Sequence, residues 1–155
     1  MKILVDADSC PKEARELTQR RAAALGIRAV FAANRRLPGI DDELMEVCPN
    51  GENSADNRIV ELAEAGDIAI SRDVPLAKRL VERNVTVIDD RGRVFTGENI
   101  NELLSLRNFM VDLAESGLGI ERKKSYGRKE LKTYADSLDR VLNSRRHCAN
   151  SRTPR

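Results

Sequence analysis

The chain has 155 residues, of which 41% are hydrophobic, 34% are charged and only 3% are aromatic. This length indicates one domain with at most a short appendage, and the core has to be built mainly from Leu, Ile, Val and Ala. No apolar run approaches the roughly 18 residues of a membrane span, and no signal peptide is recognisable, so we expect a cytoplasmic protein without a membrane partner.

The chain alternates between predicted strands and predicted helices. Residues 2–6 contain a short apolar run typical of a strand buried on both faces, and Gly26 is placed to end the first helix. The last strand is expected to pair back across a turn at residues 89–92. In chain order we expect strands at residues 2–6, 27–32, 45–48, 67–71, 85–88 and 93–96, and helices at residues 11–25, 54–65, 74–84, 98–116 and 128–142.

This alternation predicts an α/β fold in three layers, a mainly parallel sheet with helices on both faces and a C-terminal helix. We expect a single domain over residues 1–143. Residues 144–155 are polar and basic, and we expect a disordered tail there.

Cysteine and histidine usage excludes two classes of small protein. The three cysteines, Cys10, Cys48 and Cys148, are far apart in the sequence, and His147 is the only histidine. A disulfide scaffold and a structural zinc site are both disfavoured, which fits a reducing compartment. A Cys–His nucleophile is disfavoured as well.

Charge is distributed unevenly along the chain. Residues 120–155 carry 11 Lys and Arg against 4 Asp and Glu, whereas the first 119 residues carry 16 against 21. A basic C-terminal third indicates a polyanionic partner, and a solvated tail without a ligand is the competing explanation.

Four carboxylates follow the strands at one edge of the predicted sheet. Asp6 and Asp8 come after the first strand, Asp56 after the third and Asp73 after the fourth. If the first and fourth strands are neighbours at the switch in strand order, Asp6 and Asp73 converge. Mg²⁺ and Mn²⁺ prefer such oxygen ligands, and next to a phosphodiester they activate water and stabilise the leaving oxygen.

Helix capping explains part of this pattern without a metal. Asp8, Asp56 and Asp73 all lie where a carboxylate stabilises a helix N-terminus. Asp6 is different, because it ends an apolar strand too early to cap the helix that Pro11 opens.

Three polar residues flank the acidic edge, and one further acid lies elsewhere. Asn57, Ser71 and Arg72 are near it in the sequence, and the first two could orient water or phosphate or cap helices. Asp67 precedes its strand, at the opposite edge, so we interpret it as a structural turn residue.

The same residues carry a family resemblance. The stretches Val-Asp-Ala-Asp-Ser-Cys-Pro at 5–11, Ala-Asp-Asn at 55–57 and Gly-Asp-Ile-Ala-Ile-Ser-Arg-Asp-Val-Pro-Leu-Ala at 66–77 occur in that order. With these motifs the sequence resembles the bacterial YaiI/YqxD family of uncharacterised proteins, which has a PIN-like fold. The resemblance covers about residues 1–143.

PIN-like domains are usually Mg²⁺- or Mn²⁺-dependent nucleases with three or four acids at one sheet edge. The resemblance therefore implies that Asp6, Asp56 and Asp73 match those acids and that Asp8 is an extra acid of this family. Residues 120–127 depart from the family, which tends to have a Gly-Pro-rich segment there.

The sequence thus favours a metal-dependent phosphodiesterase acting on RNA rather than DNA. Asp6, Asp8, Asp56 and Asp73 are the candidate catalytic residues and metal ligands, and Lys123, Lys124 and Arg128 the candidate contacts to the nucleic-acid backbone. The alternative is a non-catalytic nucleic-acid or ribosome-associated binding module, for which low aromatic content argues against base stacking. A phosphatase or nucleotide-handling enzyme ranks last, because no Gly-rich phosphate loop is present.

Overall fold

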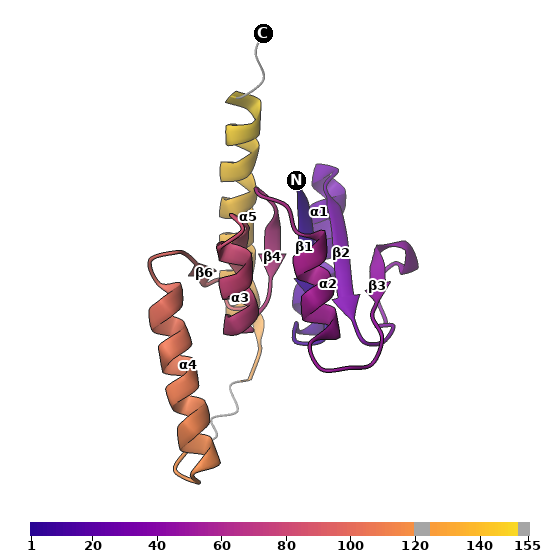
Figure 1. Ribbon diagram of the computed structural model, residues 1–155. Coiled ribbons are helices and arrows are strands. Elements are labelled where there is room, and N and C mark those ends of the chain that lie inside the picture. Colours follow the sequence, from indigo (N-terminus) through magenta and orange to yellow (C-terminus); the bar gives the residue numbers. More distant parts are fainter. Residues whose placement is uncertain (120–124, 152–155) are drawn as a thin grey trace.

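The computed structural model describes residues 1–119 and 125–151. Within these residues the strands form one six-stranded, mainly parallel sheet in the order β3-β2-β1-β4-β5-β6 (Figure 1). The α/β class expected from the sequence is confirmed. The strands are β1 (Lys2–Asp6), β2 (Arg28–Ala33), β3 (Met45–Val47), β4 (Ile68–Ile70), β5 (Thr86–Ile88) and β6 (Val94–Phe95). The helices are α1 (Lys12–Leu25), the 3₁₀ turn η1 (Asp42–Leu44), α2 (Ser54–Leu62), α3 (Val74–Val81), α4 (Ile100–Glu115) and α5 (Arg128–Ser151).

Strand β1 lies in the interior of the sheet, between β2 and β4. Leu4 is opposite Val30 of β2 on one side and Ala69 of β4 on the other, and both pairings are parallel. The chain therefore builds outward from β1 to β3 and then crosses back to place β4 on the other side of β1. The predicted contact between the first and fourth strands is confirmed, and β6 pairs antiparallel with β5 as expected.

Helices cover both faces of the sheet because successive residues of β1 point to opposite sides. Ile3 and Val5 belong to the core layer under α1 and α5, whereas Leu4 belongs to the layer under α2, α3 and the start of α4. This alternation explains why the strand is apolar at each of its central positions.

Helix α5 is tied to the rest of the molecule by buried polar contacts as well as by apolar packing. The Tyr134 hydroxyl lies 2.5 Å from the Thr18 hydroxyl of α1, so both buried groups are satisfied. Ser137 donates a hydrogen bond of 2.8 Å to the Gly92 carbonyl oxygen in the turn between β5 and β6. This turn approaches α5 closely, because a Cβ atom at Gly92 would lie 2.7 Å from the Thr133 carbonyl oxygen.

The sequence predicts the C-terminal end of α1 but not that of α5. Gly26 ends α1 as expected, with a φ of 64° in the left-handed region. Helix α5 instead continues to Ser151, so the expectation of a disordered segment from Ser144 is wrong for residues 144–151. No Gly or Pro interrupts the helix there, and Arg145 donates a hydrogen bond to the Thr86 hydroxyl at the start of β5. Residues 152–155 lie outside the described part of the chain.

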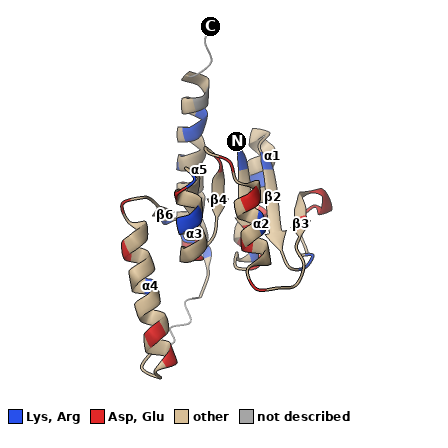
Figure 2. Ribbon diagram, viewed as in Figure 1, with Lys and Arg blue, Asp and Glu red and all other residues tan. Residues whose placement is uncertain are grey.

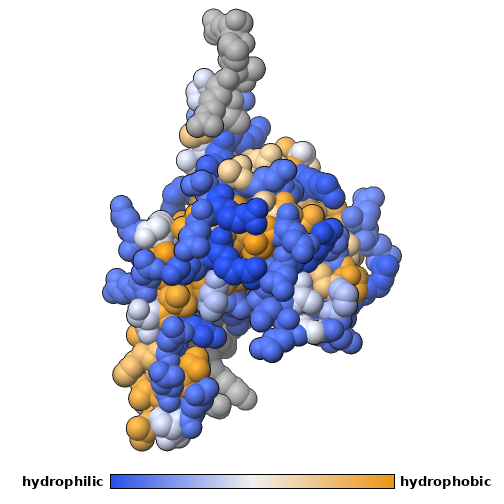
Figure 3. Space-filling view, in the orientation of Figure 1, coloured by the Kyte–Doolittle hydropathy of each residue, from blue (hydrophilic) through white to orange (hydrophobic). Residues whose placement is uncertain are grey.

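The second half of α4 extends away from the body of the molecule (Figure 1). Ile100 is buried at its start, but Leu106, Phe109 and Met110 are exposed, and Figure 3 shows apolar atoms over this projecting segment. We call residues 105–115 the α4 arm. No helix in the described ranges is long and apolar enough to cross a membrane.

Candidate functional site

The strand order creates a cavity at the carboxyl edge of the sheet. After β1 the chain runs into α1 on one face, whereas after β4 it runs into α3 on the other face, so the two connections diverge where β1 and β4 lie side by side. A cavity of about 290 Å³ opens at this edge. We call it the acid cavity; its lining residues are Asp6, Asp8, Ser9, Asn34, Asn53, Ser54, Ala55, Asp56 and Asp73.

The four acids expected at one edge are therefore brought together around one cavity. Two larger cavities, of about 360 and 710 Å³, lie elsewhere, around Gly66 and Arg145, and no Asp or Glu among the described residues lines them. A further cavity of about 240 Å³ is lined by Glu46 and Glu61, but both of these pair with Arg58. The acid cavity differs because four carboxylates and no Lys or Arg are among its described lining residues.

Asp6 is the most deeply buried acid of the cavity, with 6% of its surface exposed. Its Oδ2 atom accepts hydrogen bonds of 2.9 Å from the hydroxyls of both Ser9 and Ser71. Burial raises the pKa of this carboxyl above its ordinary value, the two hydroxyls lower it, and the charges of Asp73 and Asp8 raise it again. The net shift is upward, chiefly because burial disfavours the charged form of the carboxyl.

Asp73 and Asp8 each carry a structural hydrogen bond as well as lining the cavity. Asp73 caps α3, because its Oδ1 accepts the Leu76 N–H at 3.1 Å. Asp8 accepts the Asn34 N–H at 2.9 Å and so holds the segment that follows β2. The capping explanation is thus correct for Asp73, and it leaves the second carboxylate oxygen of that residue for other partners.

Asp56 shows the clearest electrostatic signature of the cavity. It lies in the first turn of α2, and its pKa is raised to about 6, first by burial and then by the charges of Asp6 and Asp73. A hydrogen bond with Asp73 contributes in the same direction, while Arg79 lowers the pKa. The pKa of Asp56 is thus raised by the neighbouring acids of the cavity as well as by burial.

The two supporting residues have different positions. Ser71 is buried and links two acids, because its hydroxyl donates to Asp6 and accepts the Asp73 N–H at 3.0 Å. Asn57 does not line the acid cavity; its side-chain oxygen accepts a hydrogen bond of 3.0 Å from Arg79. Asn57 directly follows Asp56 in the sequence. Because adjacent residues of a helix point in different directions, its side chain lies on a different face of α2.

The expected contacts to nucleic acid are not brought to this cavity by the described residues. Arg128 is exposed at the start of α5 and does not line the acid cavity. Lys123 and Lys124 lie outside the described residues. Figure 2 shows further basic residues on α3 and on α5.

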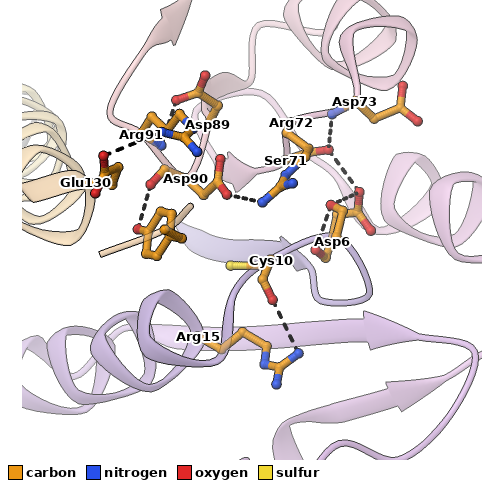
Figure 4. A network of polar contacts seen from close by, with 12 residues as sticks. Asp6, Cys10, Arg15, Ser71, Arg72, Asp73, Asp89, Asp90, Arg91 and Glu130 are labelled. Carbon is orange, nitrogen blue, oxygen red and sulfur yellow. Dashed lines mark hydrogen bonds and ion pairs between the residues drawn. The ribbon is translucent and has the colours of Figure 1, made fainter. Parts of the chain in front are cut away.

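Sequence reasoning missed an ion pair beside the cavity. Asp90 follows β5 at the same edge of the sheet, is buried, and pairs with Arg72. Figure 4 shows this pair as part of a network that also includes Asp6, Ser71 and Glu130 of α5. The sequence does carry a signal for Asp90, because Asp89 and Asp90 come directly after a strand in the same way as Asp6 does.

Arg15 is a second basic residue that the sequence did not single out. Its Nη1 atom donates to the carbonyl oxygens of Ala7 and Cys10, at 3.1 and 3.3 Å. These bonds hold the loop that carries Asp8. No sequence signal could have revealed this role, because both partners are main-chain atoms.

Two further sequence expectations concern residues outside the cavity. Asp67 is structural, as expected: it lies at the opposite edge and accepts the Lys2 main-chain N–H at 3.0 Å and the Lys2 Nζ at 2.6 Å. Cys10 is buried, and burial together with the charge of Asp90 raises the pKa of its thiol to about 12. A thiol with this pKa is a poor nucleophile at neutral pH.

The carboxylates of the cavity do not form a complete metal-chelating set as they stand. Among the described residues, no three His, Cys, Asp or Glu side chains are grouped closely enough to hold a metal as they stand. Mg²⁺, however, typically keeps several waters and is held by one or two carboxylates. The neighbouring Asp56 and Asp73, with Asp6 behind them, supply oxygen ligands of this kind.

Fold and site together define the chain as a doubly wound α/β protein with an acid cavity at its topological switch point. Comparison with known families is specific: the model of DUF188, the uncharacterised YaiI/YqxD family, matches residues 4–144. The chain belongs to this family.

Relatives named UPF0178 protein align over nearly the whole chain. The UPF0178 protein of Treponema denticola is 46% identical over 142 residues, which cover 92% of each chain. That of Treponema pallidum is 46% identical over 143 residues, covering 90% of this chain and 80% of the relative, and that of Myxococcus xanthus is 40% identical over 144 residues, covering 92% and 94%. A search of solved structures gave no significant match.

Proposed function

We propose that this protein is a divalent-metal-dependent phosphodiesterase that cleaves RNA, with DNA as the less favoured substrate. The observation that carries the proposal is the acid cavity itself, which four carboxylates from three separate segments of the chain line at the switch point of a mainly parallel sheet. We propose further that the arrangement of layers is PIN-like, which the mainly parallel sheet with acids at its carboxyl edge supports.

The electrostatics of the cavity support a cationic ligand. The pKa of Asp56 is raised to about 6 by burial and by the neighbouring charges of Asp6 and Asp73. No Lys or Arg is among the described residues that line the cavity. Negative charge gathered in this way is costly unless a proton or a cation compensates it, and at neutral pH a cation is the better match.

Roles for the individual acids follow from their contacts. Asp56 and Asp73 would hold Mg²⁺ or Mn²⁺ from one side, and Asp6, oriented by Ser9 and Ser71, from the depth of the cavity. Asp8 lies at the rim and would contact the ion through water. When bound, such an ion activates water and stabilises the leaving oxygen of a phosphodiester.

The competing function is a nucleic-acid or ribosome-associated binding module without catalysis. One observation favours it: the described acids are not grouped tightly enough to chelate a metal as they stand. In this case binding would depend on basic residues rather than on the acid cavity, and substitution of Asp56 would leave it unchanged.

The experiment that separates the two functions is an RNA cleavage assay in Mn²⁺. Labelled single-stranded and structured RNAs are incubated with the wild type, Asp56→Asn and Glu61→Gln, the last being an exposed substitution on the same helix. We expect cleavage by the wild type and by Glu61→Gln, and a loss of at least about a hundredfold for Asp56→Asn. Equal amounts of cleaved RNA from the wild type and both variants, or no cleavage by any of them, would reject the proposed phosphodiesterase activity.

A further inference from the structure

Arg72 lies in the sequence between a residue that hydrogen-bonds to an acid of the acid cavity and a residue that lines it. It follows Ser71, whose hydroxyl donates a hydrogen bond to Asp6, and it precedes Asp73, which lines the cavity. The Arg72 main chain therefore lies at the carboxyl edge of the sheet, where the acid cavity opens. The side chain itself points toward β5 and the segment that follows it (Figure 4).

The guanidinium group is held in place by a buried carboxylate. Arg72 Nη2 donates to Oδ2 of Asp90, whose side chain is only 5% exposed, whereas the Arg72 side chain is 52% exposed. Asp90 is fixed in turn, because its main-chain oxygen accepts a hydrogen bond of 2.6 Å from the Tyr126 hydroxyl. One end of this pair is thus locked in the protein and the other faces solvent.

Such an arrangement is well suited to bind a phosphate group. Guanidinium carries five N–H donors in a planar fork that matches the geometry of phosphate oxygens, and the bond to Asp90 uses only part of them. Fixing the side chain before the ligand arrives reduces the conformational entropy lost on binding. Because Arg and Lys are absent from the described lining of the acid cavity, a polyanion needs an adjacent cation of this kind.

We propose that Arg72, oriented by Asp90, binds a phosphate group of the RNA strand whose scissile bond lies at the acid cavity. Arg72 is then a substrate-binding residue and Asp90 a positioning residue. This inference rests on the proposed function and deepens it, because it names the group that receives the phosphate backbone next to four carboxylates.

Binding measured without cleavage tests this inference separately from catalysis. The affinity of a fluorescently labelled single-stranded RNA is measured by anisotropy in Ca²⁺ over a series of KCl concentrations. The variants are Arg72→Gln, Arg72→Lys, Asp90→Asn and the double variant. Arg21→Gln is the matched control, because Arg21 has a similar exposure of 43% and an ion pair of 2.9 Å with Asp139, on the α1–α5 side of the molecule.

We expect Arg72→Gln to weaken RNA binding about tenfold and to reduce the salt slope of log K by about 1. Arg72→Lys keeps the charge and should retain the slope with a smaller loss of affinity, and Arg21→Gln should match the wild type. Asp90→Asn should also weaken binding, but the double variant should be no weaker than Arg72→Gln alone, because Asp90 acts through Arg72.

Three results would overturn the inference. They are no RNA binding by the wild type, an unchanged salt slope in Arg72→Gln, or additive losses in the double variant, which would show that Asp90 acts independently of Arg72. RNA binding that depends on Arg72 together with no cleavage in Mn²⁺ would retain the inference and reject the proposed hydrolysis.

Discussion

Asp6 and Asp73 show that one carboxylate can serve the fold and still be available for chemistry. Asp73 uses Oδ1 to cap α3, and Asp6 uses Oδ2 to accept two hydroxyls. Each carboxylate has a second oxygen, so capping and metal binding are not exclusive explanations. For Asp73, helix capping by one oxygen therefore does not argue against metal binding by the other.

The raised pKa of Asp56 predicts a specific pH dependence of stability in the absence of divalent ions. Between its ordinary pKa of 3.8 and the folded-state pKa of about 6, the folded protein keeps a proton that the unfolded chain has lost, so the Asp56 contribution to stability falls as pH rises through this range. Asp56→Asn removes this loss. We expect the free energy of unfolding of Asp56→Asn, relative to that of the wild type, to increase from about pH 4 to about pH 6. Urea denaturation in EDTA measures both.

Glu61→Gln is the control for this titration, because it changes an exposed acid of the same helix. Its unfolding curve should follow the wild type throughout. If the free energy of unfolding of Asp56→Asn also has the same pH dependence as that of the wild type, the environment of Asp56 does not raise its pKa in the way described.

Thiol reactivity provides a second test at the level of residues. Cys10 and Cys48 are buried and burial raises the pKa of both thiols, whereas Cys148 is exposed on α5. An aromatic disulfide reagent at neutral pH should label one thiol rapidly in the native protein and all three after unfolding. Rapid labelling of Cys10 in the native state would contradict the packing of the loop that carries Asp8.

At the scale of elements, the turn between β5 and β6 is fixed by its contact with α5. Gly92 has a φ of 89°, and a Cβ atom there would lie 2.7 Å from the Thr133 carbonyl oxygen. We expect Gly92→Ala to lower the free energy of unfolding by about 2 kcal/mol through strain and displacement of the helix. Gly97→Ala is the control, because a Cβ atom there meets nothing within 4 Å. Equal stability of the two variants in urea would show that α5 does not pack on this turn.

The elements themselves follow largely from local patterns. The apolar run of β1, the left-handed Gly26 and the strand–helix alternation predict the sheet and its helices, because each depends on residues close in sequence. The acids at the carboxyl edge are predictable for the same reason: parallel topology fixes which turns share an edge.

Features that depend on distant residues were not predictable. The pairing of Arg72 with Asp90 requires β4 and β5 to be neighbours with a particular side-chain direction, which no local pattern encodes. Near the end of α5, Arg145 contacts Thr86, which is 59 residues away in the sequence, and no local pattern indicates that contact. Asn57 follows Asp56 directly but does not line the acid cavity, because a single step along a helix turns a side chain by about 100°.

At the scale of the whole molecule, a compact body carries a projecting α4 arm. Phe31 is completely buried beneath α1 and α5, whereas Phe109 on the arm is 59% exposed. We expect Phe31→Ala to cost about 3–5 kcal/mol of unfolding free energy and Phe109→Ala less than about 0.5 kcal/mol. Chemical denaturation compares the two, and a large loss for Phe109→Ala would mean that the arm packs in solution.

The central claim concerns the acid cavity at the switch point between β1 and β4. Its most direct test is a crystal structure of the wild type grown with Mn²⁺ and measured with anomalous scattering. We predict an anomalous peak in the cavity, bounded by Asp6, Asp56 and Asp73. A cavity without such a peak, in which these carboxylates are bonded only to hydroxyls and main-chain N–H groups, would contradict the claim.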